Sequence, residues 1–401
     1  MSLFFRTISV DEALRIAREI ASPVGTEEVP LETAAGRVLA SEISSDDDIP
    51  GFPRSVVDGY AVRAADTVGS SDAIPAMLAL SGRVSMGTLD AKPVVAGGCV
   101  YVPTGGALPE GADAVAMVEY SESLGDQVLV KRPVAPGENV VMRGEDFTAG
   151  VTVLEAGRCL SPRDTGVLAA VGCVTVPVRK KPVVGVISTG NELVPVKSEP
   201  GPGQVRDVNT YLCSSYIASL GCTPRAYGIT KDDRESLRAV LGIAVHECDA
   251  VFISGGSSKD DRDMSADLIR EIGEVLAHGI AIAPGKPTIL GRSGGKPVIG
   301  LPGHPASAFI VLMIIGGVVI RGLLGEEESR PCMVRAKLAR NIPSAKGRED
   351  YVRVTVKEGV ADPVFGKSGL LNTLVKSDGI VRIPAGREGL EVNEEVEVIL
   401  W

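Results

Sequence analysis

The chain has 401 residues, 44% of them hydrophobic and 23% charged, which is the composition of a globular protein with room for about two to four domains. A net charge of −10 and the lack of a basic tail argue against nonspecific binding to nucleic acid. The seven cysteines have no CxxC spacing and there are three histidines, so we expect reduced thiols in a cytoplasmic protein without a zinc site. Neither a signal peptide nor a membrane span is expected. The longest apolar run, residues 308–320, is shorter than the roughly 20 residues that a spanning helix needs, and it predicts a buried core helix.

Three helices are expected in the first half of the chain. Ser9 followed by Glu12 has the pattern of a capping box and predicts a helix over residues 9–20. A second, short helix is expected over residues 31–39. The third is expected over residues 161–171, with a proline at its first helical position.

A proline- and glycine-rich stretch, residues 49–62, predicts a structured loop that leads into a strand. It places Arg54, Ser55 and Asp58 close together in the sequence, flanked by apolar residues. The alternative is that Asp58 and Gly59 form a simple turn without function.

An all-β unit is expected next, over residues 61–140, because turn residues recur there at about eight to twelve positions. Its strands are predicted at residues 76–80, 98–102, 114–119 and 127–131. A Thr-Gly-Gly loop that begins at Thr104 follows the second of these strands.

Three apolar runs, each followed by small polar residues, organise the next part of the chain. They begin at Pro182, Ala250 and Pro297. Such runs are typical of parallel strands that are buried on both faces, and helical segments alternate with them, so an α/β domain is expected from residue 181 to 326. Helices are predicted at residues 209–220, 232–246, 265–276 and 305–320. From about residue 330 the hydrophobic period changes to two, which predicts a small C-terminal β domain over residues 327–401.

Ligands of open α/β sheets bind at the carboxyl ends of the strands. Loops there offer free N–H groups, which favour phosphates and other oxyanions. The candidate binding residues are therefore Ser188, Thr189 and Gly190 in the first loop, Gly255, Gly256, Ser257 and Ser258 in the second, and Pro302, Gly303 and His304 in the third.

Acidic and basic residues near these loops add to the signal. Glu192 follows the first loop and Asp263 the second, and carboxylates beside a phosphate site often hold Mg²⁺. The alternative is a solvated loop in which Asp263 caps a helix. Lys286 lies in a tight turn that would present its ammonium group, although it could equally be an ordinary exposed lysine. His304 could be a loop residue with a satisfied hydrogen bond. The sequence has no order of residues typical of a hydrolase triad and no metal-binding histidine pair.

Nine stretches, taken in chain order, carry a resemblance to a known family. With them the chain resembles the molybdopterin molybdenumtransferases, the MoeA and gephyrin E-domain family, over nearly all of its length. The stretches are PRSVVDGYAV (53–62), PTGGALPEGADAVAMVE (103–119), RGEDFTAG (143–150), ISTGNELV (187–194), VRDVNTYL (205–212), ISGGSSKDDRD (253–263), PGKP (284–287), GLPGHPAS (300–307) and GREDYVRV (347–354).

This resemblance implies a four-part chain. An elongated N-terminal domain would comprise residues 1–60 and 141–180, with the β domain inserted between them, followed by a molybdopterin-binding α/β domain and a C-terminal domain that resembles a β-barrel. It implies a homodimer whose active site lies between the α/β domain of one subunit and the N-terminal part of the other. The molybdopterin adenylyltransferase would be a partner.

The implied reaction inserts molybdate, with tungstate as an alternative, into adenylylated molybdopterin. The adenylate is hydrolysed, AMP is released, and a divalent cation such as Mg²⁺ assists. By resemblance the catalytic residues are Asp58, Asp146, Glu192, Asp263 and Lys286, and the metal ligands are Asp58, Glu192 and Asp263. Ser55, Thr104 and Ser368 are added to the substrate-binding residues.

Two departures from the family pattern make the anion pocket less positive. Ala283 stands where a lysine is usual, and Asp260 stands where a glycine is usual. His304 and Asn191 replace an asparagine and an aspartate. Two alternatives therefore stay open: a diverged paralogue that binds molybdopterin or acts as a scaffold without catalysis, and a nucleotide pyrophosphohydrolase on the same α/β domain.

Overall fold

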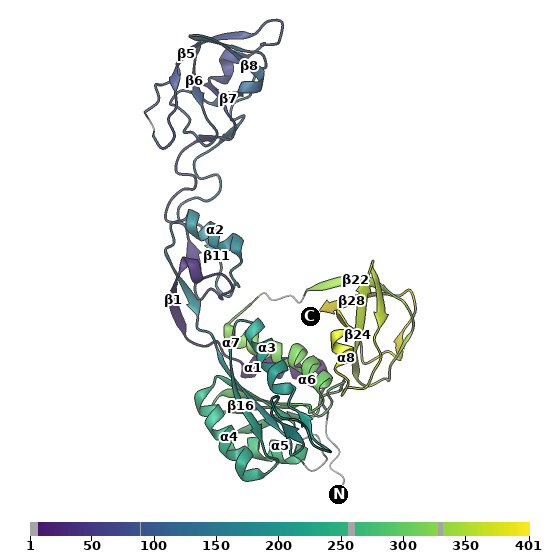
Figure 1. Ribbon diagram of the computed structural model, residues 1–401. Coiled ribbons are helices and arrows are strands. Elements are labelled where there is room, and N and C mark those ends of the chain that lie inside the picture. The colour runs from purple at the N-terminus through teal and green to yellow at the C-terminus, as the bar shows by residue number, and fades with distance from the viewer. Residues whose placement is uncertain (1–6, 89, 256–260, 328–331) are drawn as a thin grey trace. The chain divides into compact units, whose positions relative to one another are not determined.

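The structure is a computed structural model that describes residues 7–88, 90–255, 261–327 and 332–401. The chain forms two compact units (Figure 1). One comprises Met1–Ser41, Gly157–Ser161 and Val176–Trp401, and the other comprises Glu42–Ala156 and Pro162–Thr175. We call them the large unit and the small unit.

The small unit contains a six-stranded sheet in the order β7-β4-β6-β5-β9-β8. Its strands are β4 (Gly59–Val62), β5 (Ala76–Arg83), β6 (Gly98–Val102), β7 (Ala114–Met117), β8 (Ser121–Leu124) and β9 (Gln127–Val130). All four strands expected between residues 76 and 131 are confirmed. The remaining elements are β2 (Ile43–Ser44), β3 (Arg54–Ser55), η2 (Ala64–Thr67), η3 (Val118–Tyr120), β10 (Val140–Val141), β11 (Thr152–Leu154) and α2 (Pro162–Ala170). Here β3 pairs with β10, and β2 pairs with β11.

A second six-stranded sheet, in the order β16-β13-β17-β21-β20-β18, forms the centre of the large unit. Its strands are β13 (Val183–Thr189), β16 (Thr223–Thr230), β17 (Ala250–Gly255), β18 (Glu274–His278), β20 (Ile289–Ser293) and β21 (Lys296–Leu301). The first four strands in this order are parallel to one another, as expected. In contrast, β20 pairs antiparallel with β21, and β18 pairs antiparallel with β20. In the register Ser188 is opposite Ser254, and Ser254 is opposite Leu301, so three strands end side by side.

Successive residues of each strand point to opposite faces of this sheet, and each face packs against its own core. Val184, Val186 and Phe252 belong to a core with α1 (Val10–Ile20), α3 (Asn209–Ser219), α6 (Pro305–Val311), the π-helical turn η4 (Leu312–Gly316) and α7 (Gly317–Leu324). Ile187 and Ile253 face a second core with α4 (Arg234–Glu247) and α5 (Asp261–Ile272). Figure 1 shows the two groups of helices on opposite faces of the sheet.

The longest apolar run lies inside the continuous helix formed by α6, η4 and α7. This helix, Pro305–Leu324, is apolar and long enough to cross a membrane by length and composition alone, but 67% of its most apolar window is buried inside the protein. The expectation of a core helix is confirmed.

The C-terminal part of the large unit is a closed barrel. Its strands are β22 (Met333–Leu338), β24 (Glu349–Lys357), β25 (Val360–Pro363), β26 (Gly379–Ile383) and β28 (Glu395–Leu400), and the pairing of β24 with β26 closes the ring. The period of two in the sequence therefore predicted this domain correctly. Shorter elements of the large unit are β1 (Thr26–Pro30), η1 (Leu31–Thr33), β12 (Thr175–Arg179), β14 (Leu193–Val194), β15 (Val205–Arg206), β19 (Ile282–Ala283), β23 (Ile342–Pro343), α8 (Asn372–Val375) and β27 (Gly389–Leu390).

Two helix predictions were wrong in extent. The helix expected over residues 31–39 is only the 3₁₀ turn η1, because Val38 and Leu39 instead make β-bridges to Cys159 and Val178. The helix expected over residues 265–276 is α5, which begins at Asp261 and ends at Ile272.

The close approach of the backbone at Gly273 explains where α5 stops. A Cβ atom at this position would lie 2.0 Å from the carbonyl oxygen of Arg292 on the neighbouring strand β20. Glycine at this position lets the chain turn directly from the helix into β18, which carries residues 274–276 that had been expected to be helical.

Candidate active site

The first loop begins later than the sequence suggested, because Ser188 and Thr189 are the last two residues of strand β13. The buried Ser188 hydroxyl donates to Asp207 Oδ1 at 3.1 Å and lies 2.9 Å from Thr210 Oγ1. Asp207 also accepts from the backbone N–H of Thr210 at 3.1 Å. Ser188 therefore connects the end of β13 to the start of α3. Its hydroxyl is used in hydrogen bonds within the protein.

Asp232, which sequence reasoning missed, organises the rest of this loop. It accepts a hydrogen bond from the Thr189 hydroxyl and, at 3.2 Å, one from the backbone N–H of Asn191. Gly190 is buried, whereas Glu192 is exposed. Asp232 thus holds the loop in place by two hydrogen bonds, while Glu192 is exposed to solvent.

The second and third loops are joined by Asn209, the first residue of α3. Its Nδ2 donates to Ser254 Oγ at 2.6 Å and to the carbonyl oxygen of Gly303 at 2.7 Å. Gly255 ends β17 opposite Thr189 with a φ of +128°, a conformation that favours glycine. Of the second loop, Gly256, Ser257 and Ser258 lie outside the described residues.

A cavity of about 550 Å³ lies beside the third loop, and we call it the oxyanion pocket. Its lining combines apolar residues with polar and basic ones, and it comes from Thr7, the turn 280–287, the third loop and two segments of the C-terminal part. The lining residues that carry the argument are Lys286, Pro302, Gly303, His304, Arg348 and Ser368. Five of these six were expected at the site from the sequence.

His304 and Ser368 meet in this pocket although they lie 64 positions apart in the sequence. His304 Nδ1 is 2.9 Å from Ser368 Oγ, and the backbone N–H of Ala306 donates to the Ser368 carbonyl oxygen at 3.2 Å. His304 does have the satisfied hydrogen bond of the alternative interpretation, and it also lines the pocket. Lys286 is exposed and makes no ion pair with any described residue.

Arg348 was missed as a candidate, although the stretch 347–354 was one of the matched motifs. The signal was present: Arg348 follows a glycine and precedes two acidic residues within that stretch. Its guanidinium lines the pocket and pairs with Asp350 at 2.9 Å. The pocket therefore has three cationic side chains, Lys286, Lys346 and Arg348, of which Lys346 pairs with Glu388 at 3.2 Å and Arg348 with Asp350.

Asp263 lies in the first turn of α5, after the helix begins, and its side chain is outside the description. Among the residues that the structure describes, no group of three or more histidine, cysteine, aspartate or glutamate side chains could hold a metal ion.

The small unit carries the other predicted residues. The exposed Asp58 accepts two hydrogen bonds from Thr104 on Oδ1, from the backbone N–H at 2.7 Å and from the hydroxyl at 3.0 Å. Asp58 and Thr104 are thus brought together across 46 positions. Ser55 is buried and its hydroxyl is bonded to the carbonyl oxygen of Val57 at 2.6 Å. Asp146 is exposed, and its backbone N–H bonds to Ile49.

The backbone N–H of Thr104 holds the pKa of Asp58 below its ordinary value, and the Thr104 hydroxyl adds to the effect, as does the positive charge of Arg83. The carboxylate therefore remains ionised through the neutral range. Because the pKa is lowered by folding, the resulting stabilisation is present above the ordinary value and is lost as the pH falls through the lowered one.

Replacing Thr104 by valine is expected to raise the pKa of Asp58 part of the way to its ordinary value. The substitution removes the hydroxyl donor and leaves the stronger backbone donor in place. Titration of the labelled Asp58 carboxyl carbon by NMR measures this shift, and Thr104→Ser, which keeps a hydroxyl, is the matched control. An unchanged pKa in Thr104→Val would show that the hydroxyl does not bind the carboxylate in solution.

Comparison with known families covers nearly the whole chain. Residues 8–172 match the MoeA N-terminal region (domain I and II), residues 185–320 match a probable molybdopterin binding domain, and residues 335–401 match the MoeA C-terminal region (domain IV).

Individual relatives also match over nearly their full length. A putative molybdopterin biosynthesis protein of Methanocaldococcus jannaschii is 34% identical over 381 residues, which is 93% of this chain and 92% of the relative. The molybdopterin molybdenumtransferase of Bacillus subtilis is 31% identical over 403 residues, covering 98% and 94% of the two chains. A crystal structure of a molybdopterin biosynthesis MoeA protein from Pyrococcus horikoshii matches with a TM-score of 0.89 at 34% identity, over 99% of this chain and 100% of that one.

Proposed function

The chain belongs to the MoeA family, and from this premise we propose that it is a molybdopterin molybdenumtransferase of molybdenum cofactor biosynthesis. It would take adenylylated molybdopterin and molybdate as substrates, hydrolyse the adenylate with release of AMP, and leave the metal on the dithiolene. Tungstate is the alternative oxyanion. The family assignment supports this function, and the observation on the chain itself that carries it is the oxyanion pocket.

The oxyanion pocket has the chemistry that a tetrahedral dianion needs. Lys286 supplies a compact positive charge without a competing carboxylate among the described residues, and Arg348 supplies a planar set of N–H donors. Ser368 and His304, which are hydrogen-bonded to each other, add further polar groups to the lining. A pocket of about 550 Å³ has room for the oxyanion and for the reacting end of a larger substrate.

We assign the phosphorylated pterin to the neighbouring edge of the sheet. Asn209 and Asp232 hold the three loops there, so the edge at which an anion would bind is fixed by hydrogen bonds within the protein. Thr189, Gly190, Gly255 and Gly303 are the described residues that would contact it. The exposed carboxylate of Glu192 is assigned to the orientation of the attacking water, and the family resemblance adds Asp146 of the small unit to the catalytic residues.

The carboxylates also fit a hard divalent cation such as Mg²⁺, which prefers oxygen ligands. Asp58 is ionised, and while Thr104 occupies its Oδ1, the atom Oδ2 has no partner among the described residues. Glu192 is exposed and has no ion pair in the described part of the chain. By the family resemblance we propose these two residues and Asp263 as ligands of the cation, which when bound would offset negative charge on the phosphoanhydride.

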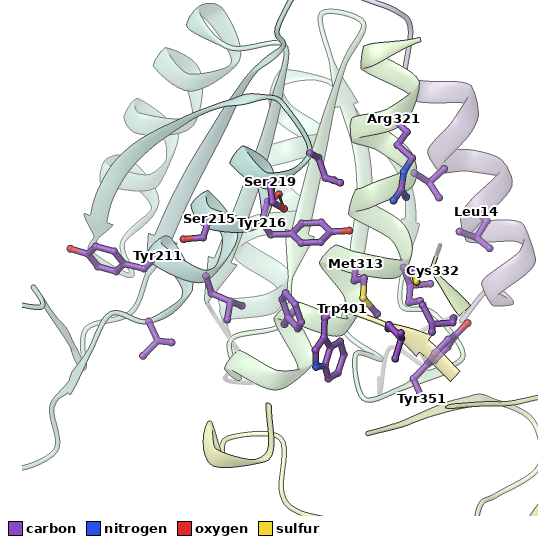
Figure 2. A pocket seen from close by; sticks show the side chains of 18 of the residues that line it. Leu14, Tyr211, Ser215, Tyr216, Ser219, Met313, Arg321, Cys332, Tyr351 and Trp401 are labelled. Carbon is purple, nitrogen blue, oxygen red and sulfur yellow. Dashed lines mark hydrogen bonds between the residues drawn. The ribbon is translucent and has the colours of Figure 1, made fainter. Parts of the chain in front are cut away.

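A homodimer is part of the proposal, and an apolar cavity of about 1,230 Å³ in the large unit supports it. Figure 2 shows Tyr211 and Tyr216 from α3, Leu14 from α1, and Trp401 around this cavity. Tyr211 and Trp401, which both line this cavity, are 54% and 42% exposed, and exposed apolar residues that cluster often mark a protein–protein interface. The mass of the native chain in solution tests this part of the proposal.

The two alternatives predict different products. A scaffold paralogue would bind molybdopterin without releasing AMP, and a pyrophosphohydrolase would cleave free dinucleotides with no need of an oxyanion. The comparisons favour the transferase, because the curated relatives with that name match the whole chain and not the α/β domain alone. We place the enzyme in the cytoplasm, where the molybdopterin adenylyltransferase would supply its substrate.

The experiment that tests the function is the release of AMP from adenylylated molybdopterin, with and without molybdate or tungstate. We expect release to depend on the oxyanion and on a divalent cation. Release that ignores both oxyanions would favour the pyrophosphohydrolase, and binding without release would favour the scaffold.

A further inference from the structure

We propose that Asp350, a buried residue behind the wall of the oxyanion pocket, determines which oxyanion the pocket accepts by fixing the guanidinium of Arg348. This inference rests on the proposed function and adds to it a residue that does not itself touch the substrate. Asp350 is thus a positioning residue.

Asp350 and Arg348 are held together in a defined geometry. Arg348 Nε donates to Asp350 Oδ1 at 2.9 Å, and its Nη2 lies 3.5 Å from Oδ2. The Asp350 side chain is 11% exposed, whereas the Arg348 side chain is 49% exposed. The buried Asp350 carboxylate therefore binds the Nε and Nη2 side of the exposed Arg348 guanidinium. Arg348 Nη1 has no partner among the described residues.

Asp350 is itself held in place by a hydrogen bond from a second residue, Ser344. The Ser344 hydroxyl donates to its Oδ2 at 2.8 Å. Asp350 also stands opposite Ala283 in the parallel pairing of β24 with β19. Alanine has no polar group, so among the described side chains the carboxylate is shared only by Arg348 and Ser344.

The neighbouring acid on β24 serves a different purpose and provides a control. Glu349 is also buried, but it pairs with Arg382 at 2.5 Å and accepts from the hydroxyl of Tyr351 at 2.9 Å. Successive residues of a strand point to opposite faces, so Glu349 and Asp350 lie on different sides of β24. Neither Glu349 nor Arg382 lines the oxyanion pocket.

Two opposing effects follow from the carboxylate beside Arg348. Its negative charge weakens the attraction of the pocket for every dianion, since like charges repel. Its hydrogen bonds also keep the Arg348 donors in one place, and a fixed set of donors distinguishes oxyanions by their size. The pocket would therefore select molybdate over the smaller sulfate by geometry, at some cost in affinity for both.

The ratio of the two affinities separates these effects. Loss of the charge alone would strengthen the binding of molybdate and sulfate in parallel, and general damage would weaken both in parallel. Only loss of the fixed geometry changes the ratio. We expect Asp350→Asn to lower the ratio of molybdate affinity to sulfate affinity by about fivefold or more. Equilibrium binding of each oxyanion to the full-length protein, measured by calorimetry, gives this ratio.

Two further variants complete the experiment. Glu349→Gln should keep the wild-type ratio, because it alters a buried carboxylate on the other face of the same strand. Ser344→Ala should lower the ratio by a smaller factor, and it tests the inference should Asp350→Asn fail to fold. A ratio that is the same in the wild type, Asp350→Asn and Ser344→Ala would overturn the inference, as would a wild-type protein that binds both oxyanions equally. A wild-type protein that binds neither oxyanion would instead contradict the proposed function.

Discussion

Replacing Lys286 by alanine is expected to lower kcat/KM for molybdate by about 100- to 1,000-fold, the range found when a preorganised group that stabilises developing charge is removed. Lys286 is the cation of the oxyanion pocket that no carboxylate in the described residues neutralises. Arg348 shares its charge with Asp350, so it cannot take over the role of Lys286. Steady-state kinetics at saturating adenylylated molybdopterin measure the effect.

The matched control for this substitution is Lys357→Ala. Lys357 is exposed at the end of β24, outside the oxyanion pocket, and its loss should leave kcat/KM within about twofold, as is usual for surface substitutions. A Lys286→Ala enzyme that matches the Lys357→Ala enzyme would show that Lys286 is only an exposed lysine in a turn.

Replacing Gly255 by alanine is expected to abolish activity and to lower the free energy of unfolding by about 3 kcal/mol or more, because strained backbone and steric overlap are combined. A Cβ atom at this position would lie 1.8 Å from the carbonyl oxygen of Thr189. That oxygen belongs to the backbone of the adjacent strand, so β13 and β17 would have to separate at the edge where we propose that the ligand binds. Urea unfolding and AMP release measure the two effects.

Gly242→Ala is the control for a change from glycine to alanine. Gly242 lies within α4, and a Cβ atom there would meet nothing within 4 Å. The substitution should stabilise the protein by about 0.5–1 kcal/mol, because alanine favours the helix. If Gly255→Ala unfolds at the same urea concentration as the wild type and remains active, the close approach of the two strands is not as described.

Local patterns in the sequence predicted the fold well where a single segment contains the whole signal. Ser9 caps α1 by accepting from the backbone N–H of Glu12 at 3.1 Å, as its spacing suggested. The second half of the predicted capping box is absent, because Glu12 pairs with Arg15 instead. The apolar runs marked the parallel strands, although Ser188 and Thr189 belong to a strand and not to the loop after it.

The candidate site could be predicted only in part, because its geometry depends on contacts between distant segments. Loops at the ends of parallel strands had to converge, and Asn209 does connect two of them. No spacing could show that Asp232 would reach back to Thr189 across 43 positions. Arg348 and Asp350 are opposite charges two positions apart in the sequence, but the oxyanion pocket that Arg348 lines comes from five separate segments.

The structure locates one of the two residues, Ala283 and Asp260, at which the sequence departs from the family pattern. Ala283 was expected to make the anion pocket less positive, and it lies in the lining of the oxyanion pocket, opposite Asp350 on the adjacent strand. Asp260 lies outside the described residues. The position of Ala283 explains how the carboxylate of Asp350 remains available to Arg348.

The most direct test of the account is the amount of AMP released from adenylylated molybdopterin by the purified protein as the molybdate concentration is raised from zero. We predict little release without an oxyanion and a saturable increase with molybdate. Release that is equally fast without molybdate, or no release at any molybdate concentration, would contradict the assignment of this chain as a molybdenum-inserting enzyme.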